Sequence, residues 1–267
     1  MRDPPVTAGD PTRSAHRPAP LLAVAHGSAD PRSAEAVERI FERVRALRPD
    51  LDVRTAYLDH VGPGAEAELT RLAADGAGEA VVLPALLTAA YHSRVDLPRL
   101  LERVSAAGPW LRIRYASTLG PHPWLLDAVE RRLREAGVRA SPDTSLVLAS
   151  AGSSDPEANA VVARAAGQLA ARGPWRSVVP AFASMASPSP AQAVAGLRAG
   201  GAPRVAVATY LLAPGLFSDR VRDQALSEGA AAVSEPLGDL PETAALALHR
   251  YTEALRAEPS FPRLPAR

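Results

Sequence analysis

The sequence predicts an α/β fold of two duplicated, doubly wound lobes, each built on a parallel four-stranded sheet. An internal repeat is the first reason: LLAVAHGSADP at 21–31 recurs as LVLASAGSSDP at 146–156, and VLPALLTAAYHS at 82–93 recurs as VATYLLAPGLFS at 207–218. Short apolar runs that alternate with segments of helical period are the second, because this pattern is typical of βαβ units with right-handed crossovers. The length of 267 residues suits two lobes related by the 125-residue offset.

The first half contains four apolar runs of strand length, each followed by a helical segment. The predicted strands are 21–25, 53–58, 80–87 and 113–117, and the predicted helices are 34–47, 63–76, 96–108 and 123–137. Continuous short apolar runs are typical of strands that are covered on both faces. Asp30 and Pro31 have the residue types of an N-cap and of a first helical position, so the first helix is expected to begin there.

The second half repeats this order. The predicted strands are 145–150, 177–183, 204–212 and 231–236, and the predicted helices are 155–171, 189–199, 217–228 and 242–255. Residues 1–20 are rich in proline and small polar residues, which predicts a disordered tail. We therefore divide the chain into this tail, an N-terminal lobe over 21–140 and a C-terminal lobe over 141–267, joined near 138–145.

Composition excludes several classes of function. The formal net charge is +1, which gives no reason to expect a nucleic-acid or membrane partner. All 30 basic residues are arginine, so Schiff-base chemistry and a phosphate-binding lysine are excluded. The absence of cysteine excludes disulfides, thiolate metal sites and iron–sulfur clusters. No stretch approaches the ~18–20 apolar residues of a membrane span, and there is no signal peptide pattern, so a cytoplasmic location is expected.

Two histidines stand at matching strand ends of the first half only. His26 corresponds to Ala151 in the repeat, and His92 corresponds to Phe217. In parallel sheets the ligand crevice lies off the carboxyl ends of the strands, which is where both histidines are predicted to lie. Two imidazoles without thiolates form an open ligand set that suits a divalent first-row metal. The N-terminal lobe is therefore predicted to be the catalytic one, and the C-terminal lobe to be degenerate.

Several residues near these histidines can also be explained by structural roles that involve no ligand. Gly27, Ser28, Asp30 and Pro31 all recur in the second copy, which favours a structural role in a tight strand-to-helix turn. Acidic residues that could complete a metal site are Asp59 and Asp96, although helix capping explains Asp96 equally well. His60 and His122 are further histidines near strand ends of the first half; a solvated loop position is the simpler reading of His60.

Three motifs together resemble the CbiX/SirB type of sirohydrochlorin chelatase, part of the class II chelatase superfamily. They are AHGS-x-DP at 25–31, P-x-LL-x-x-x-x-H-x-x-x-D-L-P at 84–98, and LGPHP at 119–123. The family's two metal-binding histidines fall on His26 and His92. Family members usually have glycine two residues before the second histidine, whereas this chain has Ala90.

The resemblance implies a lyase that inserts Fe²⁺ or Co²⁺ into sirohydrochlorin, for siroheme or cobalamin biosynthesis, with no ATP and no organic cofactor. Holding metal and ring in one cleft supplies proximity, and histidine can take up protons near neutral pH. Ser28, Arg32 and Arg94 are predicted to contact the substrate, the arginines through the carboxylates at the edge of the ring. The simpler explanation of both arginines is that they are solvated residues at the flank of a helix.

Two other functions remain open at the level of sequence. A non-enzymatic carrier of metal or tetrapyrrole would use the same two histidines, because a binding site and an insertion site share ligands. A nucleotide-dependent enzyme is a weaker alternative, since the chain lacks G-x-G-x-x-G and G-x-x-x-x-G-K-[ST].

Overall fold

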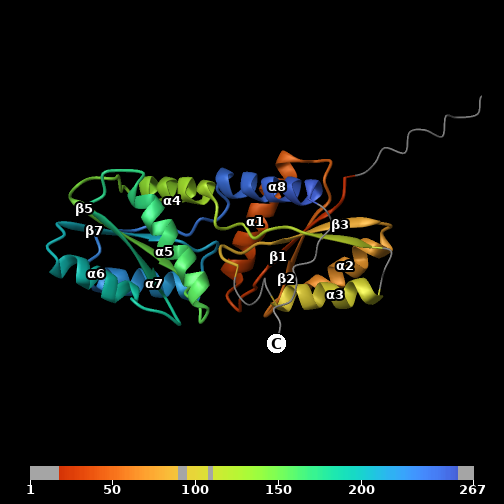
Figure 1. Ribbon diagram of the computed structural model, residues 1–267, viewed down its shortest axis with the longest axis horizontal. Helices are drawn as coiled ribbons and strands as arrows, with labels where there is room; N and C mark the ends of the chain where they lie inside the picture. Colours follow the sequence, from red (N-terminus) through yellow and green to blue (C-terminus); the bar gives the residue numbers. More distant parts are fainter. Residues whose placement is uncertain (1–17, 90–94, 108–110, 258–267) are drawn as a thin grey trace, which may run out of the picture.

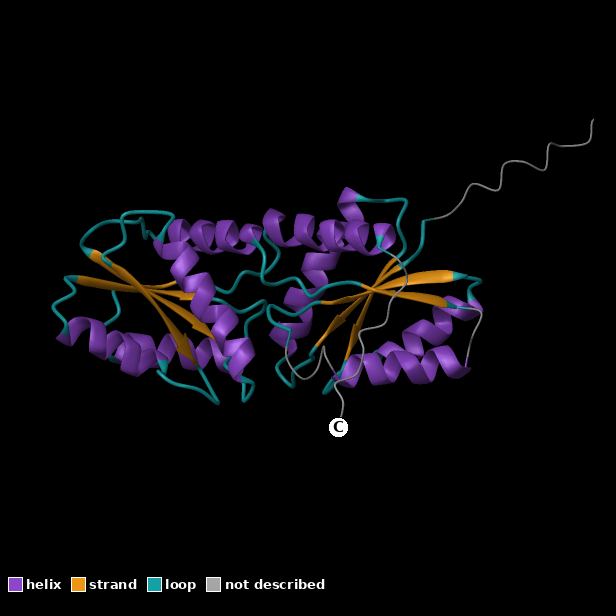
Figure 2. Ribbon diagram, in the orientation of Figure 1, coloured by secondary structure: helices purple, strands orange, loops and turns teal. Residues whose placement is uncertain are grey.

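The computed structural model describes residues 18–89, 95–107 and 111–257. Its strands are β1 (Leu21–Ala25), β2 (Val53–Tyr57), β3 (Glu79–Pro84), β4 (Arg112–Tyr115), β5 (Thr144–Ser150), β6 (Ser177–Phe182), β7 (Arg204–Thr209) and β8 (Ala232–Val233). Its helices are α1 (Pro31–Leu47), α2 (Ala65–Ala74), α3 (Leu97–Ala107), α4 (Pro123–Glu135), α5 (Pro156–Ala170), α6 (Pro190–Ala199), α7 (Leu216–Ser227) and α8 (Pro241–Arg256). Figures 1 and 2 show these elements as two lobes side by side along the long axis.

The strands form two parallel four-stranded sheets, which confirms the predicted fold class. Their orders are β2-β1-β3-β4 and β6-β5-β7-β8, so the second sheet repeats the topology of the first. Six strands end earlier than predicted: β3, β7 and β8 by three residues, at Pro84, Thr209 and Val233, β4 by two residues, and β2 and β6 by one. The apolar residues that follow β3 and β7 belong to loops at the carboxyl ends of the sheets, where the backbone leaves the strand ladder.

Alternate residues of the strands belong to different hydrophobic cores. Leu21, Ala23 and Ala25 of β1 belong to a large core that also contains residues of β5 and β7. Leu22 and Val24 belong to a second core with residues of α2 and α3. A third core covers the outer face of the second sheet with residues of α6 and α7. The large core is therefore shared by both lobes, as the side-chain alternation of a strand allows.

The last helix of each half packs against the other half. Helix α4 contacts β7 of the second sheet, while α8 contacts α1, β3 and β4 of the first lobe. Figure 1 shows α4 lying along the lobe of β5 and β7, and α8 lying over α1 and β3. The boundary between residues 140 and 141 stays a prediction, and α4 and α8 each pack across it onto the other half.

Arginine side chains tie the exchanged helices to the half on which they lie. The ties join side chains of one half to carbonyl or carboxylate oxygens of the other: Arg131 to Glu242 at 2.7 Å, Arg132 to the Pro236 carbonyl at 2.8 Å, Arg114 to the Ala257 carbonyl at 2.7 Å, and Arg250 to the Leu119 carbonyl at 3.3 Å. Planar guanidinium groups with several donors suit such contacts. The Tyr251 hydroxyl also donates to the Ala19 carbonyl at 2.8 Å.

The turn after the first strand of each half is built in the same way. Gly27 has a φ of +90° and Gly152 a φ of +83°, a region that L side chains rarely adopt. A Cβ on Gly27 would lie 1.9 Å from the carbonyl oxygen of Asp59, and a Cβ on Gly152 would lie 1.9 Å from that of Ser184. The turn therefore requires glycine at both positions. This agrees with the prediction that Gly27 has a structural role in the turn.

Replacing Gly27 by alanine is expected to lower the free energy of unfolding by about 3 kcal/mol, through the positive φ and the backbone contact together. Gly152→Ala is expected to have a similar effect. Gly76→Ala is the matched control, because Gly76 has a φ of +87° and nothing within 4 Å of an added Cβ; its cost is expected to be about 1–2 kcal/mol. Urea denaturation of the three variants measures this, and equal losses for Gly27→Ala and Gly76→Ala would contradict the steric argument.

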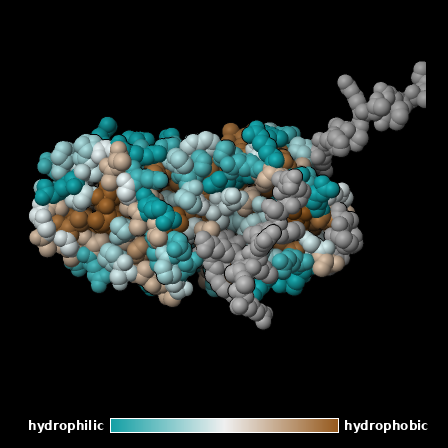
Figure 3. Space-filling view, in the orientation of Figure 1, coloured by the Kyte–Doolittle hydropathy of each residue, from teal (hydrophilic) through white to brown (hydrophobic). Residues whose placement is uncertain are grey.

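The visible face of the molecule is mostly hydrophilic or mixed, with apolar residues in small groups (Figure 3). Within the described part of the chain, no helix combines the length and apolar character needed to cross a membrane.

Candidate functional site

A cavity of about 390 Å³ opens at the carboxyl ends of β1 and β2, beside α3. Its lining comes from the residues that follow the two strands and from one side of α3: His26, Leu58, Asp59, Asp96, Arg99, Leu100 and Arg103. Three candidates from separate parts of the sequence, His26, Asp59 and Asp96, therefore line one cavity. Its position agrees with the rule that parallel sheets bind ligands off their carboxyl ends.

His26 is the first residue after β1, and its side chain is exposed. Its Nδ1 lies 3.1 Å from the Gly27 carbonyl oxygen. A carbonyl oxygen only accepts, so in that hydrogen bond Nδ1 carries the proton and Nε2 of the neutral ring carries the lone pair. Nε2 is then the atom with which His26 would bind a metal or take up a proton.

Asp59 and His60 approach His26 from the end of β2. The Asp59 backbone N–H donates to the His26 carbonyl at 3.0 Å, which holds the two loops together. The rings of His26 and His60 are stacked, with centroids 6.4 Å apart, and His60 Nε2 lies 3.6 Å from Asp59 Oδ2. The side chains of Asp59 and His60 are 68% and 48% exposed, so both are accessible to a ligand. His60 thus lies beside the cavity as a neighbour of His26.

Two arginines of the cavity, Arg99 and Arg103, were missed by the sequence analysis. Together with Asp96 and Leu100 they occupy positions i, i+3, i+4 and i+7, so they form one stripe along the start of α3 and the turn before it. This helical spacing from Asp96 is the sequence signal that could have identified Arg99 and Arg103. Because both guanidinium groups are always charged, they make this wall of the cavity suitable for carboxylates.

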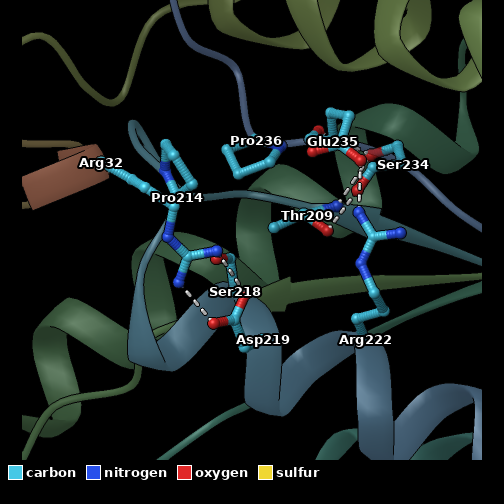
Figure 4. Close-up of a pocket in the computed structure, with 9 residues that line it drawn as sticks. All are labelled: Arg32, Thr209, Pro214, Ser218, Asp219, Arg222, Ser234, Glu235 and Pro236. Carbon is cyan, nitrogen blue, oxygen red and sulfur yellow. Dashed lines mark hydrogen bonds and ion pairs between the residues drawn. The ribbon is translucent and has the colours of Figure 1, made fainter. Parts of the chain in front are cut away.

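Arg32 extends away from this cavity toward the second lobe. Its guanidinium pairs with Asp30 at 2.5 Å and with Asp219 of α7 at 2.6 Å. The hydrogen bond from Arg32 lowers the pKa of Asp30, and both carboxylates raise the pKa of Arg32. The pair borders a second cavity of about 190 Å³ at the carboxyl ends of β7 and β8, where Figure 4 shows Arg32 directed at Asp219.

The remaining lining residues of this second cavity all come from the second half, and most of them are polar: Thr209, Pro214, Ser218, Arg222, Ser234, Glu235 and Pro236. Arg222 pairs with Glu235, and the Thr209 hydroxyl donates to the Ser234 carbonyl at 2.6 Å. Both arginines of the cavity therefore have carboxylate partners within the protein. The role of Arg32 as a substrate-binding residue stays a prediction.

Ser28 supports the turn in which it lies. Its Oγ accepts a hydrogen bond from the Asp30 backbone N–H at 3.1 Å, and Ser153 makes the same contact with Asp155 in the second half. Asp30 and Asp155 in turn accept from the second residue of α1 and of α5, as N-caps. The shared contacts explain why these residues recur in both copies, and contact of Ser28 with a substrate stays a prediction.

His122 lies at the contact between α4 and α8, as the N-cap of α4. Its Nδ1 accepts from the Trp124 backbone N–H at 3.2 Å, and its ring lies 5.3 Å from that of His249 on α8. Burial lowers the pKa of His122, and the charges of Arg250 and His249 add to the effect. A neutral ring is what the cap requires, so the structure gives His122 a role in holding α4.

His92 and Arg94 lie outside the described residues, as does Ala90. Among the described residues, no group of three or more His, Asp or Glu side chains is arranged to hold a metal ion. His92 as a second metal ligand therefore stays a prediction.

A family model and two curated relatives point to the same family for this chain. The sequence model of the CbiX family matches residues 20–136 and 145–254. The chain is 27% identical over 210 residues to a sirohydrochlorin cobaltochelatase of Priestia megaterium, covering 76% of this chain and 67% of that protein. It is 26% identical over 201 residues to a sirohydrochlorin ferrochelatase of Bacillus subtilis (strain 168), covering 75% and 77%.

A solved structure supports the fold. SirB from Bacillus subtilis with Fe³⁺ superposes with a TM-score of 0.80 at 24% identity, covering 90% of this chain and 98% of that one. The two-lobed arrangement is thus shared with a known protein over nearly its whole length.

Proposed function

This chain belongs to the CbiX family, and from that premise we propose that it is a sirohydrochlorin chelatase, a lyase that inserts Fe²⁺ or Co²⁺ into sirohydrochlorin. The observation that carries the proposal is the common cavity of His26, Asp59 and Asp96 at the carboxyl ends of β1 and β2. Relatives named for iron and for cobalt both match, so the proposal covers both metals. The product would serve siroheme or cobalamin biosynthesis.

Insertion needs a weakly held metal on one face of the ring and acceptors for two pyrrole protons. His26 can present Nε2 to the metal, and His92 is the proposed second ligand from the resemblance. Each pyrrole N–H that the metal displaces gives up a proton, which the carboxylates of Asp59 and Asp96 or an imidazole can accept. No organic cofactor enters this scheme, and the metal is a substrate.

The ring carries carboxylates at its edge, and the cavity wall offers Arg99 and Arg103 to receive them. Binding energy from these remote groups can hold and distort the ring, which favours the transition state of insertion over the bound substrate. The arginines therefore act in positioning, and the histidine and carboxylates act on metal and protons.

The test is anaerobic metallation of sirohydrochlorin, followed by absorbance with Co²⁺ and separately with Fe²⁺. We expect the protein to raise the initial rate at least about a hundredfold over the uncatalysed reaction, in line with the contribution of positioned acid–base groups. A carrier would bind metal or ring without raising that rate, and this result would contradict the proposal.

Arg32 has two possible roles that a pair of variants separates. If it binds a ring carboxylate, Arg32→Gln should weaken sirohydrochlorin binding about tenfold, whereas Asp219→Asn, which releases the guanidinium from one partner, should not weaken it. If it only ties α1 to α7, both variants should have the same small effect. Titration of sirohydrochlorin fluorescence measures the Kd values, and we expect the first pattern.

A further inference from the structure

Three aromatic rings lie together where α4 meets α8, the two helices that pack across the halves. His122 and Trp124 stand at the start of α4, and His249 belongs to α8. The ring centroids are 4.9 Å apart between His122 and Trp124, 5.3 Å between His122 and His249, and 5.2 Å between Trp124 and His249. We refer to these three residues as the aromatic joint. Because α4 and α8 contact each other (Figure 1), the joint lies in the seam between the halves.

His122 can cap α4 only while its imidazole is neutral. Its Nδ1 accepts a hydrogen bond from the Trp124 backbone N–H at 3.2 Å, so the proton of the neutral ring is on Nε2. A second proton, on Nδ1, would turn the acceptor into a donor that faces another donor, and the hydrogen bond would be lost. The imidazolium would also place a positive charge at the N-terminus of α4, where the helix dipole disfavours it. Protonation of this one ring therefore weakens the start of the helix in two ways.

Arg250 of α8 holds the segment that leads into the joint. Its side chain is only 12% exposed, and its Nη2 donates to the carbonyls of Leu119 at 3.3 Å and Pro121 at 3.2 Å. Between these two residues, the Gly120 backbone N–H donates to the Leu86 carbonyl, in the loop after β3, at 3.3 Å. A positive imidazole beside this segment repels the guanidinium. Protonation in the joint therefore acts on α8 as well as on α4, and through the segment on the loop after β3.

The carboxylates that attract a proton on His122 are engaged by other cations. They are Glu253 on α8 and Asp127 on α4. Glu253 accepts a hydrogen bond from Arg250 at 2.8 Å, and Asp127 accepts one from Arg172 at 2.5 Å. A carboxylate that is already paired stabilises a further positive charge less than a free one does. The surroundings of the joint therefore favour the neutral ring.

We infer that the aromatic joint is a pH-sensitive latch between the two halves, which neutral His122 keeps closed and which protonated His122 opens at the start of α4. Histidine is the side chain whose charge changes near neutral pH, and here the titrating group is the helix cap itself. The inference concerns the packing of the chain against itself, so it does not rest on the proposed function.

Acidification is expected to open the latch. Burial lowers the pKa of His122 below its ordinary value of 6.5, and the charges of Arg250 and His249 lower it further, while Glu253 and Asp127 act in the opposite direction. The unfolded chain therefore takes up the proton at a higher pH than the folded chain does. The stabilisation by the cap is complete above about pH 6.5 and is lost as the pH falls through the lowered pKa of the folded state.

The test compares the full-length wild type with variants in which position 122 cannot titrate near neutral pH. His122→Asn and His122→Asp both keep a side-chain oxygen for the cap, because asparagine and aspartate are preferred N-cap residues. His60→Asn is the matched control, since it removes an exposed histidine beside His26, and asparagine tolerates its φ of +65°. Urea denaturation at about pH 7.5 and about pH 5.5 gives the unfolding equilibrium constant. Hydrogen exchange at the same two pH values gives the local opening of residues 119–127.

Between the two pH values, we expect the unfolding constant of the wild type to rise about fivefold to tenfold more than that of His122→Asn or His122→Asp, as the loss of an N-cap bond implies. Either variant decides the question if the other does not fold. His60→Asn should keep the wild-type response. After correction for the intrinsic exchange rate, residues 119–127 should exchange faster at the lower pH only where His122 is present. A wild-type response in the variants at position 122, or equal protection of 119–127 at both pH values in the wild type, would overturn the latch.

Discussion

His26→Ala is expected to lower the rate of sirohydrochlorin metallation at least about a hundredfold, to near the uncatalysed rate. Its side chain is exposed at the mouth of the cavity, and Ala151 fills the equivalent position in the second half without loss of the turn. Removing the imidazole therefore deletes a metal ligand or proton acceptor and little packing. The thermal unfolding midpoint should stay within a few degrees of the wild type, because exposed side chains contribute little to stability.

Two controls make this result specific. His249→Ala removes a histidine of the distant α4–α8 contact and should leave the metallation rate unchanged. His60→Ala removes the ring stacked beside His26 and should lower the rate less than His26→Ala does. Absorbance at saturating and at limiting Co²⁺ separates weaker metal binding from slower insertion. A His26→Ala protein that keeps a third or more of the wild-type rate would remove His26 from the mechanism.

The fold was predictable from the sequence because its signals are local and repeated. Short apolar runs, helical periods and the two copies of the Gly-Ser-x-Asp-Pro turn each act over a few residues, and the two sheets carry them in the predicted order. The exchange of α4 and α8 was not predictable in the same way. An amphipathic helix shows which of its faces is buried, but not which of two similar sheets covers that face.

The candidate site was likewise predictable from the sequence only in part. His26, Asp59 and Asp96 were identifiable because each lies near the carboxyl end of a strand or just before a helix, and they line one cavity. Contact of Arg32 with the substrate was predicted because Arg32 is near His26 in sequence, and it stays a prediction. Nothing in the sequence indicates that the Arg32 guanidinium pairs with Asp219, 187 residues away. A long side chain can reach in several directions, and only the packing of the two lobes determines which partner it meets.

Ending the chain at residue 240 is expected to abolish cooperative folding, because it removes α8 from the first lobe. Leu246, Ala247 and Tyr251 are at most 2% exposed and belong to the core that both sheets share. Loss of a single buried leucine typically costs about 2–5 kcal/mol, and a whole domain is stable by only about 5–15 kcal/mol. The exposed faces of α1, β3 and β4 would then favour aggregation. Circular dichroism during heating and size-exclusion chromatography measure both effects.

A chain ending at residue 257 is the matched control and should melt like the full-length protein, since it keeps α8 and its contact with Arg114. Leu246→Ala should fold with a free energy of unfolding about 3 kcal/mol lower, which shows the same core losing one side chain. If the chain ending at 240 unfolds cooperatively at the wild-type midpoint, α8 is an appendage of the first lobe. If this shortened chain does not unfold cooperatively, the hydrophobic core of the first half is incomplete without the second half. Duplication has then produced one folding unit, and the second half is retained for stability as well as for any contact with the substrate.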